Sequence, residues 1–213
     1  MTPTRPFEST IQSFLDAASS SAPTPGGGGV AALVAALGSS MTSMVANLTR
    51  GQKFSEVEAS MENLANHMRS SIIRFEELLG ADVDSFNQYM AALKRPKATD
   101  EEKATRLGAL QTATIAATEV PLALAGECLT ALEATRYAAD AANKQVLSDL
   151  GIAAMLLETA GQSALLTADI NILSIKDGTV RDGFAAQRDR LAIQLQGLRD
   201  ATMGVVRHRM AQG

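Results

Sequence analysis

Residues 19–49 read SSSAPTPGGGGVAALVAALGSSMTSMVANLT, and the rest of the chain is organised around this stretch. It contains the signals of a helix start: Thr24 can cap a helix, Pro25 suits the first helical position, and a long apolar run follows. We therefore expect a helix over residues 25–49. The glycines that begin at Gly26 are unusual there, because glycine costs about 1 kcal/mol per helical position relative to alanine.

Two interpretations explain why a helix start would accept that cost. Backbone N–H groups with no side chains over them form a binding site for an anion or for a polar ring edge. Alternatively, the glycines let a second helix cross at short range. No Gly-Lys-Ser/Thr follows the glycines, so the stretch does not resemble a P-loop for nucleotide phosphates.

The same helix carries two stripes at helical spacing. The first is apolar and predicts a core face: Val30, Leu33, Val34, Leu37, Met41, Met44, Val45 and Leu48. The second is small and weakly polar: Ala32, Ala36, Ser40, Ser43 and Asn47. The second stripe either packs closely on another helix or lines a pocket. Asn47 needs a hydrogen-bond partner if it is buried.

Composition predicts an all-α protein. The chain has 213 residues, 46% of them apolar and only 4% aromatic, and signals for strands are almost absent. We expect a bundle of long helices forming a single domain over residues 1–213. Besides 25–49, the expected helices cover residues 7–18, 55–94, 100–118, 121–142, 145–173 and 183–209. Pro121 should kink or restart its helix, and the helix over 145–173, apolar nearly all round, should lie at the centre.

Charge and cysteine content narrow the partners and the compartment. The net charge is −4 with no basic block, which argues against nucleic acid and against an anionic membrane as partners. No signal peptide or membrane span is evident. Cys128 is the only cysteine, which excludes an internal disulfide and favours a reducing, cytoplasmic location. No spacing of histidine, cysteine and carboxylate residues suggests a metal site.

One carboxylate stands out within the expected helix over residues 55–94. Asp82 occupies an apolar position of a stripe that also holds Phe75, Leu78, Leu79, Phe86, Tyr89, Met90 and Leu93. Asp84 points to another face and should be solvated. A carboxylate in an apolar stripe is costly unless it is paired, so Asp82 either forms a structural ion pair or serves a function. Glu127 is a second candidate for a buried carboxylate, and we expect it to have a structural partner.

Four blocks of sequence together resemble the cyclodeaminase/cyclohydrolase family. The first joins residues 23–29 to 44–49 and looks like the opening signature of that family. The later blocks are residues 82–87 followed by 93–97, Asn143 with residues 148–151, and residues 170–177. They occur in the order of the family and cover nearly the whole chain. The family includes the C-terminal domain of formiminotransferase-cyclodeaminase and stand-alone methenyltetrahydrofolate cyclohydrolases.

The resemblance implies an all-helical homodimer that acts on a folate substrate, which can carry a polyglutamate tail. The implied reaction is hydrolysis of 5,10-methenyltetrahydrofolate to 10-formyltetrahydrofolate, without a cofactor beyond the substrate. The alternative is cyclodeamination of formiminotetrahydrofolate with release of ammonia. The formiminotransferase part of the bifunctional enzymes is missing, so this chain would act alone. Gly80, Ala81 and Thr167 depart from the family pattern, which often has acidic residues near the first two positions and asparagine at the third.

These arguments select the candidate site residues. Asp82 is the first choice for the catalytic carboxylate, since the stripe and the resemblance agree on it, and Asp149 is the second. The substrate-binding candidates are Thr24, Pro25, Gly26, Gly27, Gly28, Asn47, Lys53, Ser148 and Asn171. Lys53, together with Lys94 and Lys97, could meet the carboxylates of a glutamate tail. No metal ligand is expected.

A protein of another class is the rival hypothesis. A non-catalytic helical dimerisation protein would explain the alanine-rich helices. It would leave unexplained the glycines after Pro25, the carboxylate at Asp82 and the four ordered blocks.

Overall fold

The computed structural model describes residues 6–212, and within this range the chain forms helices and no strands. The α-helices are α1 (Ile11–Ala18), α2 (Gly27–Asn47), α3 (Glu58–Leu93), α4 (Asp100–Ala138), α5 (Leu147–Ile172) and α6 (Gly178–Ala211). Short 3₁₀ turns occur at Pro6–Glu8, Gln52–Phe54 and Lys144–Val146. The prediction of an all-α bundle of long helices in a single domain is confirmed.

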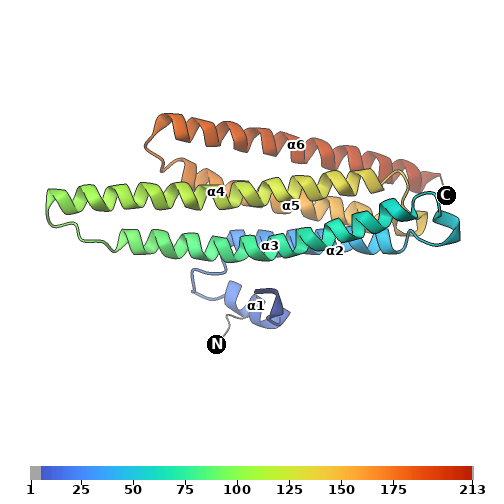
Figure 1. Ribbon diagram of the computed structural model, residues 1–213, viewed down its shortest axis with the longest axis horizontal. Coiled ribbons are helices and arrows are strands. Elements are labelled where there is room, and N and C mark those ends of the chain that lie inside the picture. Colours follow the sequence, from blue (N-terminus) through green and yellow to red (C-terminus); the bar gives the residue numbers. More distant parts are fainter. Residues whose placement is uncertain (1–5, 213) are drawn as a thin grey trace.

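Four helices form the centre of the bundle. α2 packs against α3 and α5, and α4 packs against the same two helices, so that the four close into a ring. α6 lies along α4 and α5, whereas α1 is set apart from the bundle (Figure 1). The first turn and α1 reach the core through Phe7 and Phe14. α5 therefore has three helical neighbours, as its central position in the sequence pattern suggested.

The buried face of α2 is built almost entirely from small residues, and the prediction about this helix is wrong in this respect. Its buried face consists of Gly28, Gly29, Ala31, Ala32, Ala35, Ala36, Gly38, Ser39, Thr42, Val45 and Ala46. The reason is close approach to α5: a Cβ atom added to Gly38 would lie 2.9 Å from Leu157 Cγ. Large side chains do not fit at that distance, so most of the predicted apolar stripe turns away from the core.

Part of that apolar stripe lies at the surface beside exposed side chains of α5. Leu37 is 52% exposed and Leu166 is 65% exposed. We define the α2–α5 face by its exposed apolar residues on the two helices: Val30, Leu37, Ile152, Met155, Leu166 and Ile170. The predicted small stripe is split, since Ala32 and Ala36 are buried whereas Asn47 is exposed.

A buried polar pair crosses the ring. The hydroxyls of Thr42 on α2 and Thr135 on α4 lie 2.8 Å apart, and both residues are fully buried. The Thr135 hydroxyl donates to the carbonyl of Ala131 at 2.8 Å, so Thr42 donates to Thr135. The pair satisfies both hydroxyls inside an otherwise apolar core.

Several helix boundaries differ from the predictions for local reasons. α1 begins at Ile11 because Thr10 caps it. The N-cap of α2 is Gly26, so Thr24 does not cap that helix and Pro25 is not its first residue. α6 begins at Gly178, five residues before the expected start, because the Asp177 side chain accepts hydrogen bonds from the N–H groups of Thr179 and Val180.

Pro121 neither ends nor restarts a helix. α4 continues through it from Asp100 to Ala138, held in place by its packing against α3, α5 and α6. The start of α4 agrees with the expected start at residue 100, where Thr99 and Glu102 form a capping box.

No candidate membrane span was evident from the sequence, but three helical segments meet the length and composition of one. Gly27–Asn47, Asp100–Ala138 and Lys144–Ile172 are long and apolar enough to cross a membrane by length and composition alone. About half of each apolar window is buried inside the bundle: 56%, 44% and 50%, respectively.

Candidate functional site

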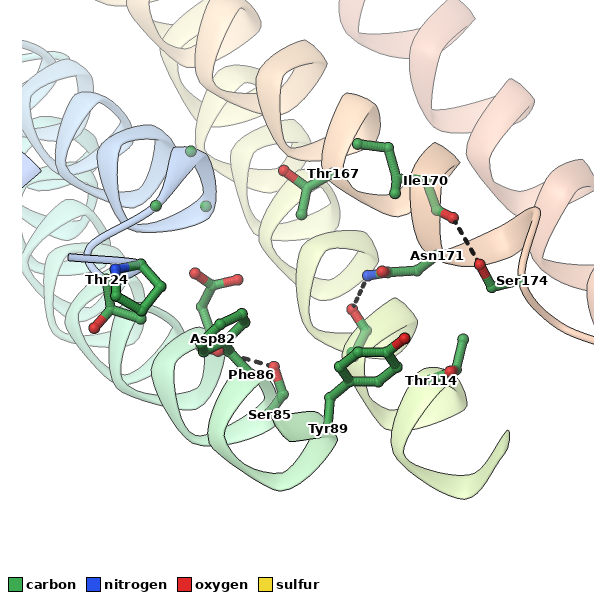
Figure 2. Close-up of a pocket in the computed structure, with 15 residues that line it drawn as sticks. Thr24, Asp82, Ser85, Phe86, Tyr89, Thr114, Thr167, Ile170, Asn171 and Ser174 are labelled. Atoms are coloured by element: carbon green, nitrogen blue, oxygen red, sulfur yellow. Dashed lines mark hydrogen bonds between the residues drawn. The ribbon is translucent and has the colours of Figure 1, made fainter. Parts of the chain in front are cut away.

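A cavity of about 330 Å³ lies where the start of α2 meets α3, α4 and α5 (Figure 2). Cavities of this size suit small organic ligands. The segment before α2 and its first turn supply Pro23, Thr24, Gly26, Gly27 and Gly28. α3 supplies Asp82, Ser85, Phe86 and Tyr89, and the opposite wall holds Thr114, Ala117, Thr167, Ile170, Asn171 and Ser174.

Asp82 points from α3 toward the glycines at the start of α2 (Figure 2). A Cβ atom added to Gly28 would lie 2.5 Å from Asp82 Oδ1 and 2.7 Å from Oδ2, a separation that real atoms do not adopt. The backbone N–H of Gly29 donates a hydrogen bond to the same carboxylate. At Gly28, therefore, the missing side chain makes room for a carboxylate of the protein itself, a role that neither sequence interpretation foresaw.

The environment of Asp82 changes its acidity. Burial in the cavity wall disfavours the charged form and raises the pKa of Asp82, while the hydrogen bond from Gly29 lowers it, and burial has the larger effect. Asp84, two residues later, is exposed, as the helical pattern predicted. A carboxyl group with a raised pKa at the wall of a cavity is suited to accept a proton and later return it.

The α3 wall continues along the helical face of Asp82. Phe86 and Tyr89 follow it by four and seven residues and line the same cavity. The Ser85 hydroxyl donates to the backbone carbonyl of Asp82 at 2.9 Å, so it does not occupy the carboxylate. The sequence pattern had placed Phe86 and Tyr89 in the stripe of Asp82, and that shared stripe was the signal that could have identified them as site residues.

Most polar side chains of the opposite wall already form hydrogen bonds within the protein. The Asn171 Nδ2 amide donates to the carbonyl of Ala117 at 2.7 Å, and the Thr114 hydroxyl donates to the carbonyl of Leu110 at 2.8 Å. The Thr167 hydroxyl has no hydrogen-bond partner among residues 6–212, and a Cβ atom on Gly27 would lie 3.9 Å from it. Sequence reasoning missed Thr114 and Ala117, because only the packing of α4 brings them here.

The structure gathers six of the predicted site residues around this cavity: Thr24, Gly26, Gly27, Gly28, Asp82 and Asn171. Pro25 lies just outside it. It lines a neighbouring groove between α1 and α3, together with Phe14 and Leu79.

Four predicted site residues lie away from this cavity within a single chain, so their part in binding or catalysis stays a prediction. Asn47 is the last residue of α2, which is about 30 Å long, so it lies at the far end from Gly27. Ser148 and Asp149 occupy the first turn of α5, whereas the cavity is lined by its last turns. Lys53 follows α2 and is exposed, with its Nζ atom 5.5 Å from the ring centre of Phe54.

Other polar groups named by the sequence have structural roles. Glu127 accepts a hydrogen bond from the Ser71 hydroxyl at 2.8 Å, which confirms the expected partner. Cys128 is completely buried, and burial raises the pKa of its thiol, with a further contribution from the charge of Glu127. Among residues 6–212 no group of three or more histidine, cysteine, aspartate or glutamate side chains is arranged to hold a metal ion.

Comparison with known proteins places these features in a family. The sequence profile of formiminotransferase-cyclodeaminase matches residues 10–190. The methenyltetrahydrofolate cyclohydrolase of Methylorubrum extorquens is 38% identical over 190 residues, covering 89% of this chain and 88% of that protein.

Two further comparisons agree. The formimidoyltransferase-cyclodeaminase of Sus scrofa is 35% identical over 188 residues, and the match spans 34% of that longer protein. The crystal structure of formiminotetrahydrofolate cyclodeaminase from Thermotoga maritima superposes with a TM-score of 0.86 at 26% identity, covering 95% of this chain and 98% of that one. The chain belongs to the formiminotransferase-cyclodeaminase family.

Proposed function

We propose that this protein hydrolyses 5,10-methenyltetrahydrofolate to 10-formyltetrahydrofolate. One observation carries the proposal: the half-buried carboxylate of Asp82 faces a cavity of a size suited to a bicyclic ring. The relative from Methylorubrum extorquens, which aligns over nearly the whole length of both chains, carries the name of this activity.

The reaction needs a carboxylate that handles one proton twice. The substrate carries a cationic amidinium carbon, to which a water molecule adds while a base takes a proton from that water. The bond between the carbon and the N5 atom of the ring then breaks, N5 receives a proton, and the added hydroxyl releases its remaining proton to solvent as the formyl C=O bond forms. We assign both transfers to Asp82, which first acts as base and then as acid, and whose negative charge also stabilises the cation.

The remaining cavity residues would hold the substrate. Phe86 and Tyr89 offer ring faces beside Asp82 for a flat heterocycle, and Asn171 offers a polar group on the opposite wall. Lys94 and Lys97 follow the end of α3 and are exposed. We assign them to the carboxylates of a glutamate tail, because they lie close in sequence to Tyr89 at the cavity.

We propose that the protein works in the cytoplasm without a metal or redox cofactor and without nucleic acid or membrane partners. The amidinium carbon of the substrate is already an electrophile, so the chemistry does not call for a Lewis acid. In a soluble protein, packing within the bundle would bury part of the apolar surface of these helices, and the proposed dimer would bury more of it.

We further propose a homodimer that associates through the α2–α5 face. α2 contains no charged residue, and Leu37 and Leu166 expose large apolar side chains on this face. A second cavity runs along the face and shares Gly27, Thr167 and Ile170 with the first. A partner subunit on this face would therefore also close one side of the proposed substrate cavity.

Cyclodeamination is the second candidate, because the Thermotoga maritima structure and the mammalian relatives carry that name. Formiminotetrahydrofolate gives the same methenyl cation when it loses ammonia, so one site could serve both reactions. A helical dimerisation protein without catalysis remains the alternative of another class.

The first experiment follows the loss of methenyltetrahydrofolate absorbance with purified wild-type protein, Asp82→Asn and the exposed control Asp84→Asn. We expect wild type and Asp84→Asn to accelerate hydrolysis and Asp82→Asn to lose at least 100-fold, the scale typical of a general acid or base. Full activity in a folded Asp82→Asn protein would remove Asp82 from the mechanism. If wild type is inactive here but releases ammonia from the formimino compound, the protein is a cyclodeaminase. Inactivity on both would favour the non-catalytic alternative.

A further inference from the structure

Pro121 leaves one backbone carbonyl of α4 without its helical partner. In an α-helix each carbonyl accepts from the N–H four residues later, and Pro121 has no N–H to give to Ala117. α4 nevertheless continues unbroken through this position, and Pro121 is buried. The carbonyl of Ala117 is therefore left to accept a hydrogen bond from another donor.

The donor comes from α5. Asn171 Nδ2 donates to the Ala117 carbonyl at 2.7 Å, and both residues line the cavity that contains Asp82 (the dashed line at Asn171 in Figure 2). A carbonyl can only accept, so the side of the amide that meets it must be the NH₂ group. The contact thus fixes which way the Asn171 amide faces.

The other side of the amide is left open. Asn171 Oδ1 accepts no hydrogen bond from residues 6–212, and it is not among the buried polar atoms that lack a partner, so it is accessible at the cavity wall. With the NH₂ group already engaged, Asn171 presents an acceptor to a ligand. Such an acceptor selects a ligand edge that carries N–H donors.

We infer that Pro121 is a positioning residue for ligand binding: by freeing the Ala117 carbonyl it orients Asn171, whose Oδ1 accepts from an N–H edge of the bound heterocycle. This inference rests on the proposed function in naming that heterocycle as the folate ring. The orientation of Asn171 itself depends only on the three residues and can be tested without turnover.

The test compares Pro121→Ala, Asn171→Ala, the double variant and the control Gly126→Ala. Pro121→Ala restores an N–H to α4. This N–H can donate to the Ala117 carbonyl, so Asn171 loses its hydrogen bond to that carbonyl. Gly126→Ala improves the same helix at a position where an added Cβ meets nothing within 4 Å, and it leaves that carbonyl alone. Both single α4 variants should remain folded, since each replaces a poor helix former.

Two readouts decide the outcome. In protein labelled with ¹⁵N-asparagine, the side-chain NH₂ signals that disappear in Asn171→Ala should shift in Pro121→Ala and stay in place in Gly126→Ala. The KM for methenyltetrahydrofolate should rise about fivefold in Pro121→Ala and about tenfold in Asn171→Ala, as expected for one lost hydrogen bond. The double variant should be no worse than Asn171→Ala, with kcat nearly unchanged throughout.

Unshifted NH₂ signals in Pro121→Ala would overturn the inference, as would losses in KM that multiply in the double variant. If wild type neither binds nor hydrolyses the folate, the proposed function is wrong. The NH₂ signals would then still decide whether Pro121 orients Asn171.

Discussion

Gly28 and Asp82 lie so close that any side chain at Gly28 would overlap the carboxylate, since a Cβ atom there would be 2.5 Å from Asp82 Oδ1. One residue belongs to the first turn of α2 and the other to the C-terminal third of α3, so the contact fixes how these two helices meet at the cavity. It explains why this helix start tolerates glycine where alanine would stabilise the helix. The two features that stood out in the sequence, the glycines and the carboxylate in an apolar stripe, are parts of one arrangement.

This contact predicts that Gly28→Ala is far more harmful than a methyl group added elsewhere. The new Cβ atom must push the Asp82 carboxylate from its position, and a displacement of about 1 Å can cost on the order of 100-fold in rate. We expect that loss in kcat/KM for methenyltetrahydrofolate, with the helical circular dichroism signal retained. The matched control is Gly80→Ala on α3, where nothing lies within 4 Å of an added Cβ and where activity should stay within about threefold. Equal activities in the two variants would contradict the prediction.

The raised pKa of Asp82 predicts that Asp82→Asn stabilises the fold at neutral pH. The native state holds the proton of this carboxyl more tightly than the unfolded chain does, since burial raises the pKa above its ordinary value of 3.8. The stability that Asp82 contributes is complete below about that pH and is lost as the pH rises through the raised native pKa. Asparagine does not ionise. The melting temperature of the Asp82→Asn protein should therefore exceed that of wild type at pH 7.5, and the difference should shrink toward pH 3.8.

The exposed neighbour supplies the control for that measurement. Asp84→Asn removes an equal charge from the same helix at a solvated position, and it should leave the melting temperature nearly unchanged at both pH values. An Asp82→Asn protein that is less stable than wild type at pH 7.5 would show that the ionised carboxylate is well paired in the fold.

The same shift predicts the direction of the pH–rate profile. As the base, Asp82 must start ionised, so kcat/KM should fall as the pH drops through its raised pKa, at a higher pH than an ordinary carboxyl group would give. The measurement follows methenyltetrahydrofolate absorbance across pH, with the uncatalysed rate subtracted at each value. The residual activity of Asp82→Asn should lack this acid limb. An acid limb that persists in the variant would assign it to another group.

Much of this fold follows from local sequence, because helix periodicity and capping act over a few residues. The capping box of Thr99 and Glu102 and the half-buried position of Asp82 were both predictable in this way. The buried face of α2 was not. Apolar size suggested Leu37 as a core residue, but the close approach of α5 at Gly38 favours small side chains inside and leaves Leu37 outward.

The residues of the candidate site likewise fall into those that local sequence predicts and those that only tertiary packing brings together. Phe86 and Tyr89 share a helical face with Asp82 and could have been named from the sequence, whereas Thr114 and Ala117 come to the cavity only through the packing of α4. The resemblance that selected Asn47 and Asp149 gives no information on how far apart these residues lie in the fold. Both lie at the ends of α2 and α5 that are remote from Asp82 within one chain. The bond between Asn171 and Ala117 was equally hidden, since it depends on an N–H that Pro121 lacks.

The buried hydroxyl pair predicts a measurable coupling across the ring. Thr42→Val should lower the free energy of unfolding by about 1 kcal/mol, because it removes the hydrogen bond to Thr135 with little change in volume. Thr130→Val is the control on α4, where the hydroxyl is exposed and its loss should change stability by less than about 0.5 kcal/mol. Urea unfolding of Thr42→Val, Thr135→Val and their double variant, beside the control, would measure the coupling. Strictly additive losses would contradict a direct bond between the pair.

The proposed dimer predicts that a charge on the α2–α5 face changes the oligomeric state. Leu37→Glu or Leu166→Glu would place a carboxylate in a contact between apolar surfaces, where an unpaired charge is costly, so each should convert the dimer to a monomer in light scattering after size-exclusion chromatography. The control is Ile193→Glu on α6, a somewhat more exposed apolar residue away from that face, which should leave the dimer intact. Because the face adjoins the cavity at Gly27 and Thr167, the monomeric variants should also show a raised KM. A wild-type protein that is monomeric at micromolar concentration, or a dimer that survives Leu37→Glu and Leu166→Glu alike, would mean that this face is not the subunit contact.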